Sequence, residues 1–318
     1  MKSTVPNFSE KKVFQSPYKV SDSNLLDRFK DIQTQNINWY PGHMLKAKKE
    51  FAAQLKRVDV VLELRDARIP ETSVNHDFEQ LLGQKRRLVL FNKTGLADPD
   101  ATKAWEARLR NEEHPHLFID VLTSRNLKRI LPLAQQLMAE RWGNLHKRGI
   151  NPPVLKLLIA GIPNVGKSTL INRLVHRKAA ETGPRPGVTK RQEWVRLARD
   201  ARLLDTPGIL WPKIETMEAG FRLAVTGAIK DEVVGIDRVC DFLLRTLQTQ
   251  NPEVLSKCYQ LDTLQVESDP QELLAQIAQR RGCLKPGGVV DEVRAATVVL
   301  RDFREGRLGQ LTFDDPNG

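Results

Sequence analysis

The stretch Val154-Leu-Lys-Leu-Leu-Ile-Ala-Gly-Ile-Pro-Asn-Val-Gly-Lys-Ser-Thr-Leu-Ile-Asn172 joins an apolar run to the pattern Gly-x-x-x-x-Gly-Lys-Ser. This order predicts a buried strand, a phosphate-binding loop and the start of a helix. Gly161 and Gly166 let the backbone turn N–H groups toward phosphate oxygens, and the helix adds the positive end of its dipole. Lys167 is expected to reach the β- and γ-phosphates, and Ser168 to offer its hydroxyl to Mg²⁺. The residues of this loop predicted to contact the nucleotide are Pro163, Asn164, Val165, Gly166, Lys167, Ser168 and Thr169.

The composition indicates about two domains and an acidic partner. Hydrophobic residues make up 40% of the 318 residues, which is ample for a core in each domain. Fifty Lys and Arg against 39 Asp and Glu give a formal charge of +11. Nucleic acid is therefore the first candidate for a partner, with a generally basic enzyme as the alternative. The cysteines, Cys240, Cys258 and Cys283, have neither disulfide pairing nor metal-ligand spacing, which fits a reducing compartment.

The first 35 residues are predicted to form a mobile N-terminal extension. They have no apolar signal core and contain four acidic residues, Glu10, Asp22, Asp27 and Asp31, which argues against a secretory signal and a transit peptide. No stretch of the sequence is long and apolar enough to span a membrane. We therefore expect a cytoplasmic protein.

Upstream of the phosphate loop, strand-like apolar runs alternate with helical periodicity. We predict helices at about 44–58, 76–82, 100–111 and 127–142, strands at 58–64, 87–91 and 117–122, and a connector at 143–153. The second strand delivers Asn92 and Lys93 at its carboxyl end, where α/β proteins place their ligands. This pair invites comparison with the base-reading Asn-Lys-x-Asp of GTP-binding proteins.

Downstream of the phosphate loop, a Gly- and Pro-rich loop ends in Thr189, and two strands at 194–198 and 201–204 follow. They lead into Asp205-Thr-Pro-Gly208, which matches the Asp-x-x-Gly loop that senses a γ-phosphate. Asp205 is expected to hold Mg²⁺ through water, and the Gly208 N–H to meet the phosphate. The alternation predicts an α/β fold with a doubly wound, mostly parallel sheet. From about Pro212 only helical periodicity remains, so we predict a nucleotide-binding domain over 36–211 and an all-α domain over 212–318.

The order of these segments predicts a circular permutation. In an ordinary GTP-binding domain the phosphate loop precedes the base-reading loop, whereas here Asn92 and Lys93 precede Gly161. Permutation is tolerated when the original termini lie close together, because the sheet positions the loops whatever the chain order. As a result, the chain passes from Gly208 almost directly into the helical domain, so the nucleotide state could reposition that domain.

Six segments in this order resemble the ribosome biogenesis GTPase A family of circularly permuted GTPases. They are Trp39-Tyr-Pro-Gly-His-Met44, Asp66-Ala-Arg-Ile-Pro70, Gly161-Ile-Pro-Asn-Val-Gly-Lys-Ser168, Asp205-Thr-Pro-Gly-Ile-Leu-Trp-Pro212, Leu223-Ala-Val-Thr-Gly-Ala-Ile-Lys-Asp231 and Arg281-Gly-Cys-Leu284. The resemblance implies a P-loop GTPase whose Mg²⁺ is held by Ser168, Thr189 and Asp205. It also implies a factor that acts late in large-subunit assembly, binds the precursor particle and its rRNA, and leaves on hydrolysis. We expect the protein to be a monomer.

The resemblance further assigns a catalytic role to His43. Ras-like proteins orient the attacking water with a Gln after Asp-x-x-Gly, but Ile209 stands there and cannot form a hydrogen bond. The unperturbed pKa of histidine, about 6.5, suits His43 for polarising a water; the alternative is a turn residue that caps the following helix. Lys167, Thr189 and Gly208 complete the expected catalytic set. Asn164 resembles the Asn with which related GTPases bind K⁺, or it is an ordinary loop residue.

The base-reading loop departs from the family pattern. Asn-Lys-x-Asp needs a carboxylate at its fourth place for guanine N1 and N2, yet Gly95 stands there and Asp98 lies three residues further along. Val121-Leu-Thr123 likewise occupies the place of Ser-Ala-Lys. Because a charge-assisted bond contributes about 1.5–3 kcal/mol, we expect weak discrimination against other bases, which Gly95→Asp should restore. The alternative functions are a ribosome- or RNA-binding protein with relaxed or vestigial nucleotide specificity, and a base-tolerant NTPase elsewhere in RNA metabolism.

Overall fold

Buried apolar runs assemble into one six-stranded sheet. The structure is a computed structural model that describes residues 41–179, 193–205, 214 and 216–317. The strands are β1 (Val60–Asp66), β2 (Arg86–Asn92), β3 (His116–Phe118), β4 (Leu155–Gly161), β5 (Glu193–Ala198) and β6 (Ala201–Asp205). They lie in the order β3-β2-β1-β4-β6-β5, and every neighbouring pair is parallel except β5 with β6. The predicted α/β fold with a mostly parallel sheet is confirmed.

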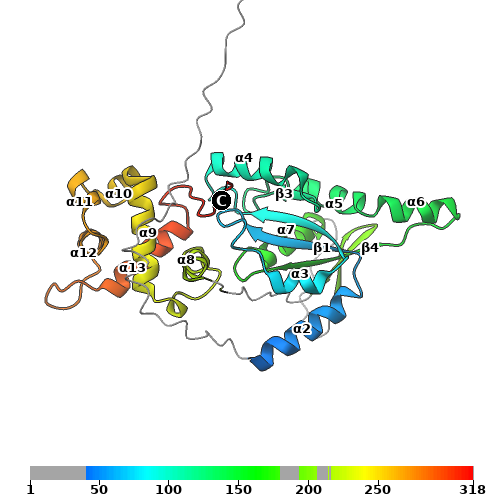
Figure 1. The fold of residues 1–318 in the computed structure, drawn as a ribbon, viewed down its shortest axis with the longest axis horizontal. Helices are drawn as coiled ribbons and strands as arrows, with labels where there is room; N and C mark the ends of the chain where they lie inside the picture. Colours follow the sequence, from blue (N-terminus) through cyan, green and yellow to red (C-terminus); the bar gives the residue numbers. More distant parts are fainter. Residues whose placement is uncertain (1–40, 180–192, 206–213, 215, 318) are drawn as a thin grey trace, which may run out of the picture.

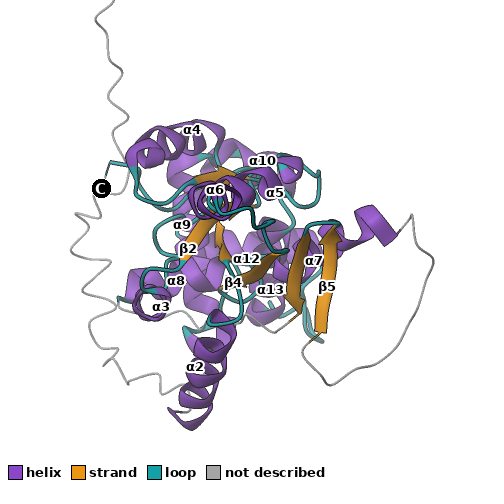
Figure 2. Cartoon of the chain, turned by 90° about the vertical axis from the view of Figure 1, so that its right-hand side faces the viewer, coloured by secondary structure: helices purple, strands orange, loops and turns teal. Residues whose placement is uncertain are grey.

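Helices cover both faces of this sheet, as the near-continuous apolar strands require. In β1, Val60 and Leu62 enter one core while Val61 enters the other. The first face is covered by α5 (Leu127–Gln136) and α7 (Lys167–Ala179), and the second by α2 (Pro41–Leu55), α3 (His76–Leu82) and α4 (Pro99–Arg108). Figures 1 and 2 show these helices on the two sides of the sheet. Phe51 and Leu55 of α2 and Val58 after it are all buried.

The helix predicted at 127–142 is two helices, and its end was predicted too early. α5 stops at Gln136, and α6 (Ala139–Lys147) begins after Met138, whose side chain is drawn into the core at the break. α6 runs past Gly143, so the predicted connector is partly helical. The stop is Gly149, which adopts a left-handed conformation with φ +70° and donates its N–H to the His146 carbonyl.

All described elements after β6 are helical. They are α8 (Met217–Val225), α9 (Ile236–Gln250), α10 (Pro252–Tyr259), α11 (Thr263–Glu267), α12 (Pro270–Arg281) and α13 (Glu292–Arg304), with a short 3₁₀ turn at Asp231–Val233. Asp269 caps the first turn of α12, and Gly282 ends the helix in a left-handed conformation. α13 starts at Glu292, where the Asp291 side chain accepts the Arg294 N–H. Sequence reasoning missed α10 and α11, although Asp262 and Gln265 form a readable capping box.

The C-terminal segment ties the helical half to the sheet. Residues 305–317, which the domain prediction placed in the helical domain, follow α13 without a further helix and lie beside α4 (Figure 1). The N–H of Phe313 donates to the Arg68 carbonyl and that of Leu311 to the Leu96 carbonyl. The buried carboxylate of Asp314 accepts the N–H groups of Glu71 and Thr72. These bonds hold the loops after β1 and β2 against the helical half.

No helix in the described part of the chain combines the length and apolar character needed to cross a bilayer. The boundary predicted at 211/212 falls outside the described residues and stays a prediction, as does the extension over 1–35.

Candidate functional site

The loop between β4 and α7 has the form expected for binding phosphate. α7 begins at Lys167, so the N–H groups of its first turn and the positive end of its dipole face the loop. The Lys167 ammonium donates to two loop carbonyls, Gly161 O at 3.0 Å and Ile162 O at 2.6 Å. Burial, together with the charge of Lys93, lowers the pKa of Lys167 to about 8. The side chain is therefore held over the loop, and it is mostly charged at neutral pH and loses its charge above pH about 8.

This lowered pKa predicts a pH dependence of nucleotide binding. Phosphate binds the charged form of Lys167, so affinity should be constant below pH about 8 and fall by up to tenfold per unit above it. Equilibrium titration of a fluorescent nucleotide between pH 7 and 9 measures this. Lys167→Arg is the matched control, because a guanidinium stays charged throughout, and a parallel decline in that variant would contradict the assignment to Lys167.

Gly166 lets the phosphate loop pack against the end of β2. Its φ of +105° is one that other residues rarely adopt, and a Cβ there would lie 2.4 Å from Asn92 Nδ2. The amide of Asn92 uses this space, because Nδ2 donates to Val165 O at 2.8 Å and Oδ1 accepts the Val121 N–H at 3.1 Å. Asn92 thus joins the loops after β2, β3 and β4. We predicted Asn92 as a base-reading residue, and in the structure it braces the three loops around that place.

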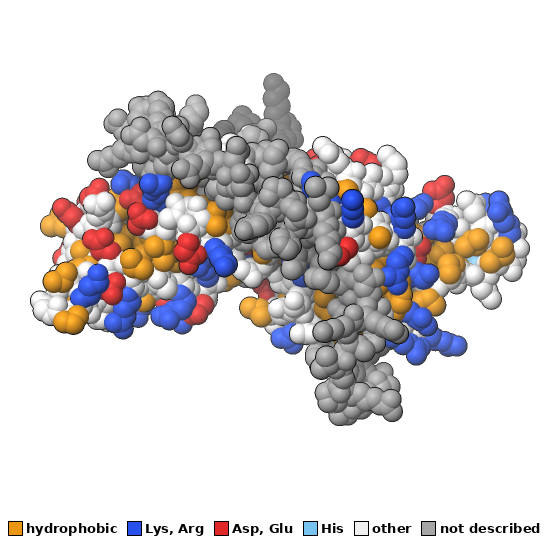
Figure 3. Space-filling model, turned by 90° about the horizontal axis from the view of Figure 1, so that it is seen from below, with side chains coloured by type: hydrophobic (Ala, Val, Ile, Leu, Met, Phe, Trp, Pro, Cys, Tyr) orange, Lys and Arg blue, Asp and Glu red, His pale blue; other side chains and the backbone are white. Residues whose placement is uncertain are grey.

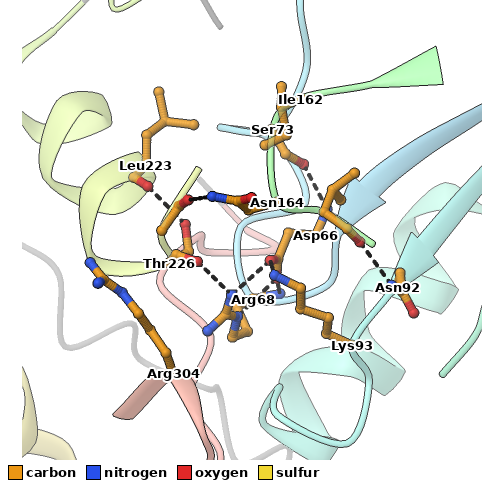
Figure 4. A network of polar contacts seen from close by, with 12 residues as sticks. Asp66, Arg68, Ser73, Asn92, Lys93, Ile162, Asn164, Leu223, Thr226 and Arg304 are labelled. Atoms are coloured by element: carbon orange, nitrogen blue, oxygen red, sulfur yellow. Dashed lines mark hydrogen bonds and ion pairs between the residues drawn. The ribbon is translucent and has the colours of Figure 1, made fainter. Parts of the chain in front are cut away.

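Lys93 is held by a buried ion network (Figure 4). The Nζ of Lys93 lies 2.9 Å from Asp66 Oδ2. Arg68 donates to the same carboxylate twice, from Nε to Oδ1 at 2.9 Å and from Nη2 to Oδ2 at 2.8 Å. Burial alone would raise the pKa of Asp66, but Arg68 and Lys93 hold it well below its usual range. Burial lowers the pKa of Lys93, and Asp66 offsets part of that effect. Sequence reasoning singled out Asp66 and Arg68 only through a resemblance, and the structure shows that they position Lys93.

Asn164 connects the phosphate loop to the helical half. It adopts a left-handed conformation with φ +54°, and its Nδ2 donates to Gly227 O at 2.8 Å, just after α8 (Figure 4). Arg68 donates to the neighbouring Thr226 carbonyl at 3.0 Å, and Arg304 of α13 donates to the carbonyls of Ala224 and Val225. Cationic and amide donors suit the carbonyl-rich end of a helix. Three elements therefore meet at the end of α8, and one of them is the phosphate loop.

Two of the three residues predicted to hold Mg²⁺, Ser168 and Asp205, lie at or after the ends of adjacent strands. Ser168 is exposed in the first turn of α7, which follows β4, and Asp205 ends β6, which pairs with β4. A hydroxyl and a carboxylate are the hard oxygen donors that Mg²⁺ takes, so this donor set fits the ion. Thr189, Gly208 and the side chains of His43 and Asp205 lie outside the described residues, so their roles stay predictions. Among the side chains that the structure describes, no cluster of three His, Cys, Asp or Glu suggests another metal site.

The loop around Gly95 contains a carboxylate that sequence reasoning missed. The Gly95 N–H donates to Asp120 Oδ2 at 3.0 Å, and a Cβ at Gly95 would lie 2.9 Å from the same oxygen. Asp98 caps α4 instead, accepting the N–H groups of Asp100 and Ala101 with one oxygen. No spacing rule links Gly95 to Asp120, because the two residues belong to loops after different strands.

Comparisons with known proteins agree with this geometry. Residues 156–275 match the family described as "50S ribosome-binding GTPase". The chain is 42% identical over 280 residues to "Ribosome biogenesis GTPase A" of Bacillus pumilus, covering 88% of this chain and 99% of that one. It is 36% identical over 297 residues to "Mitochondrial ribosome-associated GTPase 1" of Mus musculus, covering 87% and 89%.

Solved structures show the same fold. The crystal structure of GNP-bound YlqF from T. maritima superposes with a TM-score of 0.60 at 26% identity, covering 85% of this chain and 98% of that one. A GDP-bound YlqF structure superposes with the same TM-score of 0.60 at 25% identity. The likeness extends over both the sheet and the helical half, because most of each chain is covered.

Proposed function

The chain belongs to the ribosome biogenesis GTPase A family of circularly permuted, GTP-hydrolysing enzymes, and from this premise we propose that it assists late assembly of the large ribosomal subunit. It binds the precursor particle and its rRNA as a monomer in the cytoplasm, and hydrolysis of GTP releases it. Mg²⁺ held by Ser168, Thr189 and Asp205 would neutralise charge on the phosphates. The observation that carries the release step is the bond between Asn164 of the phosphate loop and Gly227 after α8.

That bond gives nucleotide a route to the helical half. In a GTPase the loops around the γ-phosphate change arrangement on hydrolysis, and packed elements that share bonds with them respond. A K⁺ ion beside the phosphates would be coordinated by Asn164 Oδ1 while Nδ2 donates to the Gly227 carbonyl, so a rotation of this one amide during hydrolysis would change its bond to Gly227. Arg68 and Arg304 keep hold of the other carbonyls at this helix end, so the release would shift the end of α8 without unfolding it.

The end of the helical half formed by α12, α13 and the turn between them, here called the α12–α13 tip, is exposed, basic and partly apolar. Six basic residues lie on α12, on α13 or between them, and two of these form ion pairs: Arg304 with Asp231 and Arg281 with Asp302. The other four, Arg280, Lys285, Arg294 and Arg301, are exposed. Leu284, Val289 and Val293 are exposed beside them. Figure 3 shows positive and negative side chains mixed over the helical half and mainly positive ones over the sheet half, so we propose that rRNA contacts both.

Salt should therefore weaken binding to ribosomal particles steeply. Each Lys or Arg that neutralises an RNA phosphate releases counterions, so the logarithm of affinity falls linearly with the logarithm of salt concentration. The fourfold variant Arg280→Gln, Lys285→Gln, Arg294→Gln and Arg301→Gln should show a smaller slope than the parent. Co-sedimentation with large subunits between about 50 and 200 mM KCl measures both slopes. Equal slopes would exclude the α12–α13 tip from the interface.

His43→Ala is expected to lower the GTPase rate, most clearly when ribosomal particles stimulate it. Because Ile209 cannot orient a water, loss of the imidazole should cost about 10²–10⁴-fold in turnover, the usual range for a general acid–base group. GDP affinity should not change, since the role concerns water rather than phosphate. Single-turnover hydrolysis with large subunits measures the effect, with His146→Ala on α6 as the control. Equal stimulated rates for parent and His43→Ala would leave His43 with a structural role alone, in the first turn of α2.

One experiment separates the proposed function from its alternatives. Hydrolysis of GTP, ATP and XTP is measured with and without purified large subunits, and co-sedimentation is measured with GDP and with a non-hydrolysable GTP analogue. We expect stimulated GTP hydrolysis and nucleotide-dependent binding. Equal binding to large subunits with GDP and with the GTP analogue would support an RNA-binding protein with vestigial hydrolysis. Hydrolysis that large subunits do not stimulate would support an NTPase that acts elsewhere.

A further inference from the structure

We propose that Asp120 supplies the guanine-reading carboxylate that Gly95 lacks, so that the recognition group has moved from the loop after β2 to the loop after β3. The proposal rests on the GTPase activity of the family and is independent of any ribosomal role. Its basis is the contact between the two positions. Asp120 Oδ2 accepts the Gly95 N–H at 3.0 Å and lies 2.9 Å from the place of an absent Cβ. The carboxylate therefore occupies the space that a side chain at position 95 would enter.

Steric exclusion makes the two arrangements alternatives. A Cβ at 2.9 Å from an oxygen is closer than real Cβ atoms come, and a second carboxylate there would face the first. An aspartate at position 95 would therefore push the Asp120 carboxylate out of its present place. Gly95→Asp alone would exchange one carboxylate for another, so we expect a smaller gain in guanine affinity than the sequence suggests.

The other nearby carboxylate is already used. Asp98 Oδ1 accepts from the N–H groups of Asp100 and Ala101, and the Asp98 N–H donates to Thr312 Oγ1 at 3.1 Å. These bonds make Asp98 the N-cap of α4. It cannot turn toward a base without uncapping α4.

Asp120 retains the bonding capacity that guanine needs. A carboxylate offers about four acceptor sites, and Asp120 uses one on each oxygen, for the N–H groups of Gly95 and Thr123. Within the described residues no Lys or Arg pairs with it, although its side chain is buried. Two acceptor sites on adjacent oxygens therefore remain for two parallel donors. The N1–H and N2–H groups of guanine form such a pair.

The surroundings of Asp120 place it at the base site. The next residue, Val121, donates its N–H to Asn92, which also holds the phosphate loop through Val165 O. Arg173 of α7 donates to Leu122 O at 3.2 Å, and Leu122 is 72% exposed. The loop of Asp120 thus contacts both the loop that follows Lys93 and α7, the helix whose first turn faces the phosphate loop. A nucleotide with its phosphates on that turn directs its base toward this loop.

Displacement of fluorescent GDP from the full-length protein with Mg²⁺ tests the proposal, using GDP, IDP, XDP and ADP as competitors. Inosine lacks the 2-amino donor of guanine, and xanthine has a carbonyl oxygen in its place. The unmodified protein should prefer GDP to IDP by about tenfold or more, as expected for one charge-assisted bond. Asp120→Asn should weaken GDP by about 10- to 100-fold, strengthen XDP, whose oxygen can accept from the new amide, and leave ADP unchanged.

Two further variants control for folding and for the competing carboxylate. Asp98→Asn keeps the helix cap and should keep guanine preference, because Asn caps as well as Asp. Asp120→Ser should lose the preference, and Gly95→Asp with Asp120→Ser should recover it, since serine leaves room for the restored carboxylate. If Asp120→Asn does not fold, the comparison of Asp120→Ser with the double variant Gly95→Asp, Asp120→Ser still tests the proposal. Equal affinity of the unmodified protein for GDP, IDP and XDP would overturn the proposal. Unchanged preference in folded Asp120→Asn or Asp120→Ser, or loss of preference in Asp98→Asn, would also overturn it.

Discussion

Lys167→Ala should lower GTP affinity by about 100- to 1000-fold while the protein stays folded. The ammonium of Lys167 donates to two loop carbonyls, and with nucleotide it would make two charge-assisted bonds to phosphate at about 1.5–3 kcal/mol each, partly offset by the carbonyl bonds that it gives up. Its removal leaves the strand and helix intact, because the side chain packs over the loop rather than in the core. Isothermal titration with a non-hydrolysable GTP analogue measures the loss.

Lys156→Ala provides a matched control for this prediction. Lys156 is exposed on the same strand, β4, so the variant removes one positive charge without touching the loop. Its affinity for nucleotide should stay close to that of the parent. A folded Lys167→Ala protein with parental affinity would mean that the loop between β4 and α7 does not bind phosphate.

Arg68→Met should destabilise the protein by about 3–5 kcal/mol. Arg68 is 1% exposed, and its removal leaves the Asp66 carboxylate buried with Lys93 as its remaining cation. The bond to the Thr226 carbonyl and the contact of the guanidinium with the Phe303 ring, 5.5 Å from its centroid, are lost as well. Both the carboxyl end of β1 and the end of α8 should become less stable, because Arg68 bonds to Asp66 and to the Thr226 carbonyl. Urea unfolding followed by circular dichroism gives the change in free energy.

Two variants check the cause of that loss. Asp66→Asn combined with Arg68→Met should recover part of the stability, since an amide is less costly to bury alone than a charge. Lys103→Met removes a partner from an exposed ion pair on α4 and should leave the unfolding curve unchanged. Equal destabilisation by the single and double variants would mean that packing of the long side chain, not charge pairing, dominates at position 68.

Sequence and structure give opposite expectations for guanine selectivity. From the sequence, Gly95 in place of an aspartate predicts weak selectivity. In the structure a carboxylate is present at that position after all, contributed by Asp120 from 25 residues away. The sequence pattern could not show this because a motif records neighbours along one loop. Contacts between the loops after β2 and β3 depend on the pairing of the strands.

The sequence by itself determined the strand, loop and helix from Val154 to Asn172, the alternation of elements before it, and the permuted order of the motifs. Those features depend on local periodicity and on glycines in backbone conformations that few other residue types adopt. Tertiary structure alone decided that Asn92 braces three loops, that Asn164 bonds to Gly227 and that the C-terminal segment holds the loop at Leu96. It did so because parallel strands bring their carboxyl ends together at one edge of the sheet, whatever their separation along the chain. Side chains at that edge find partners by strand order, which the linear pattern does not contain.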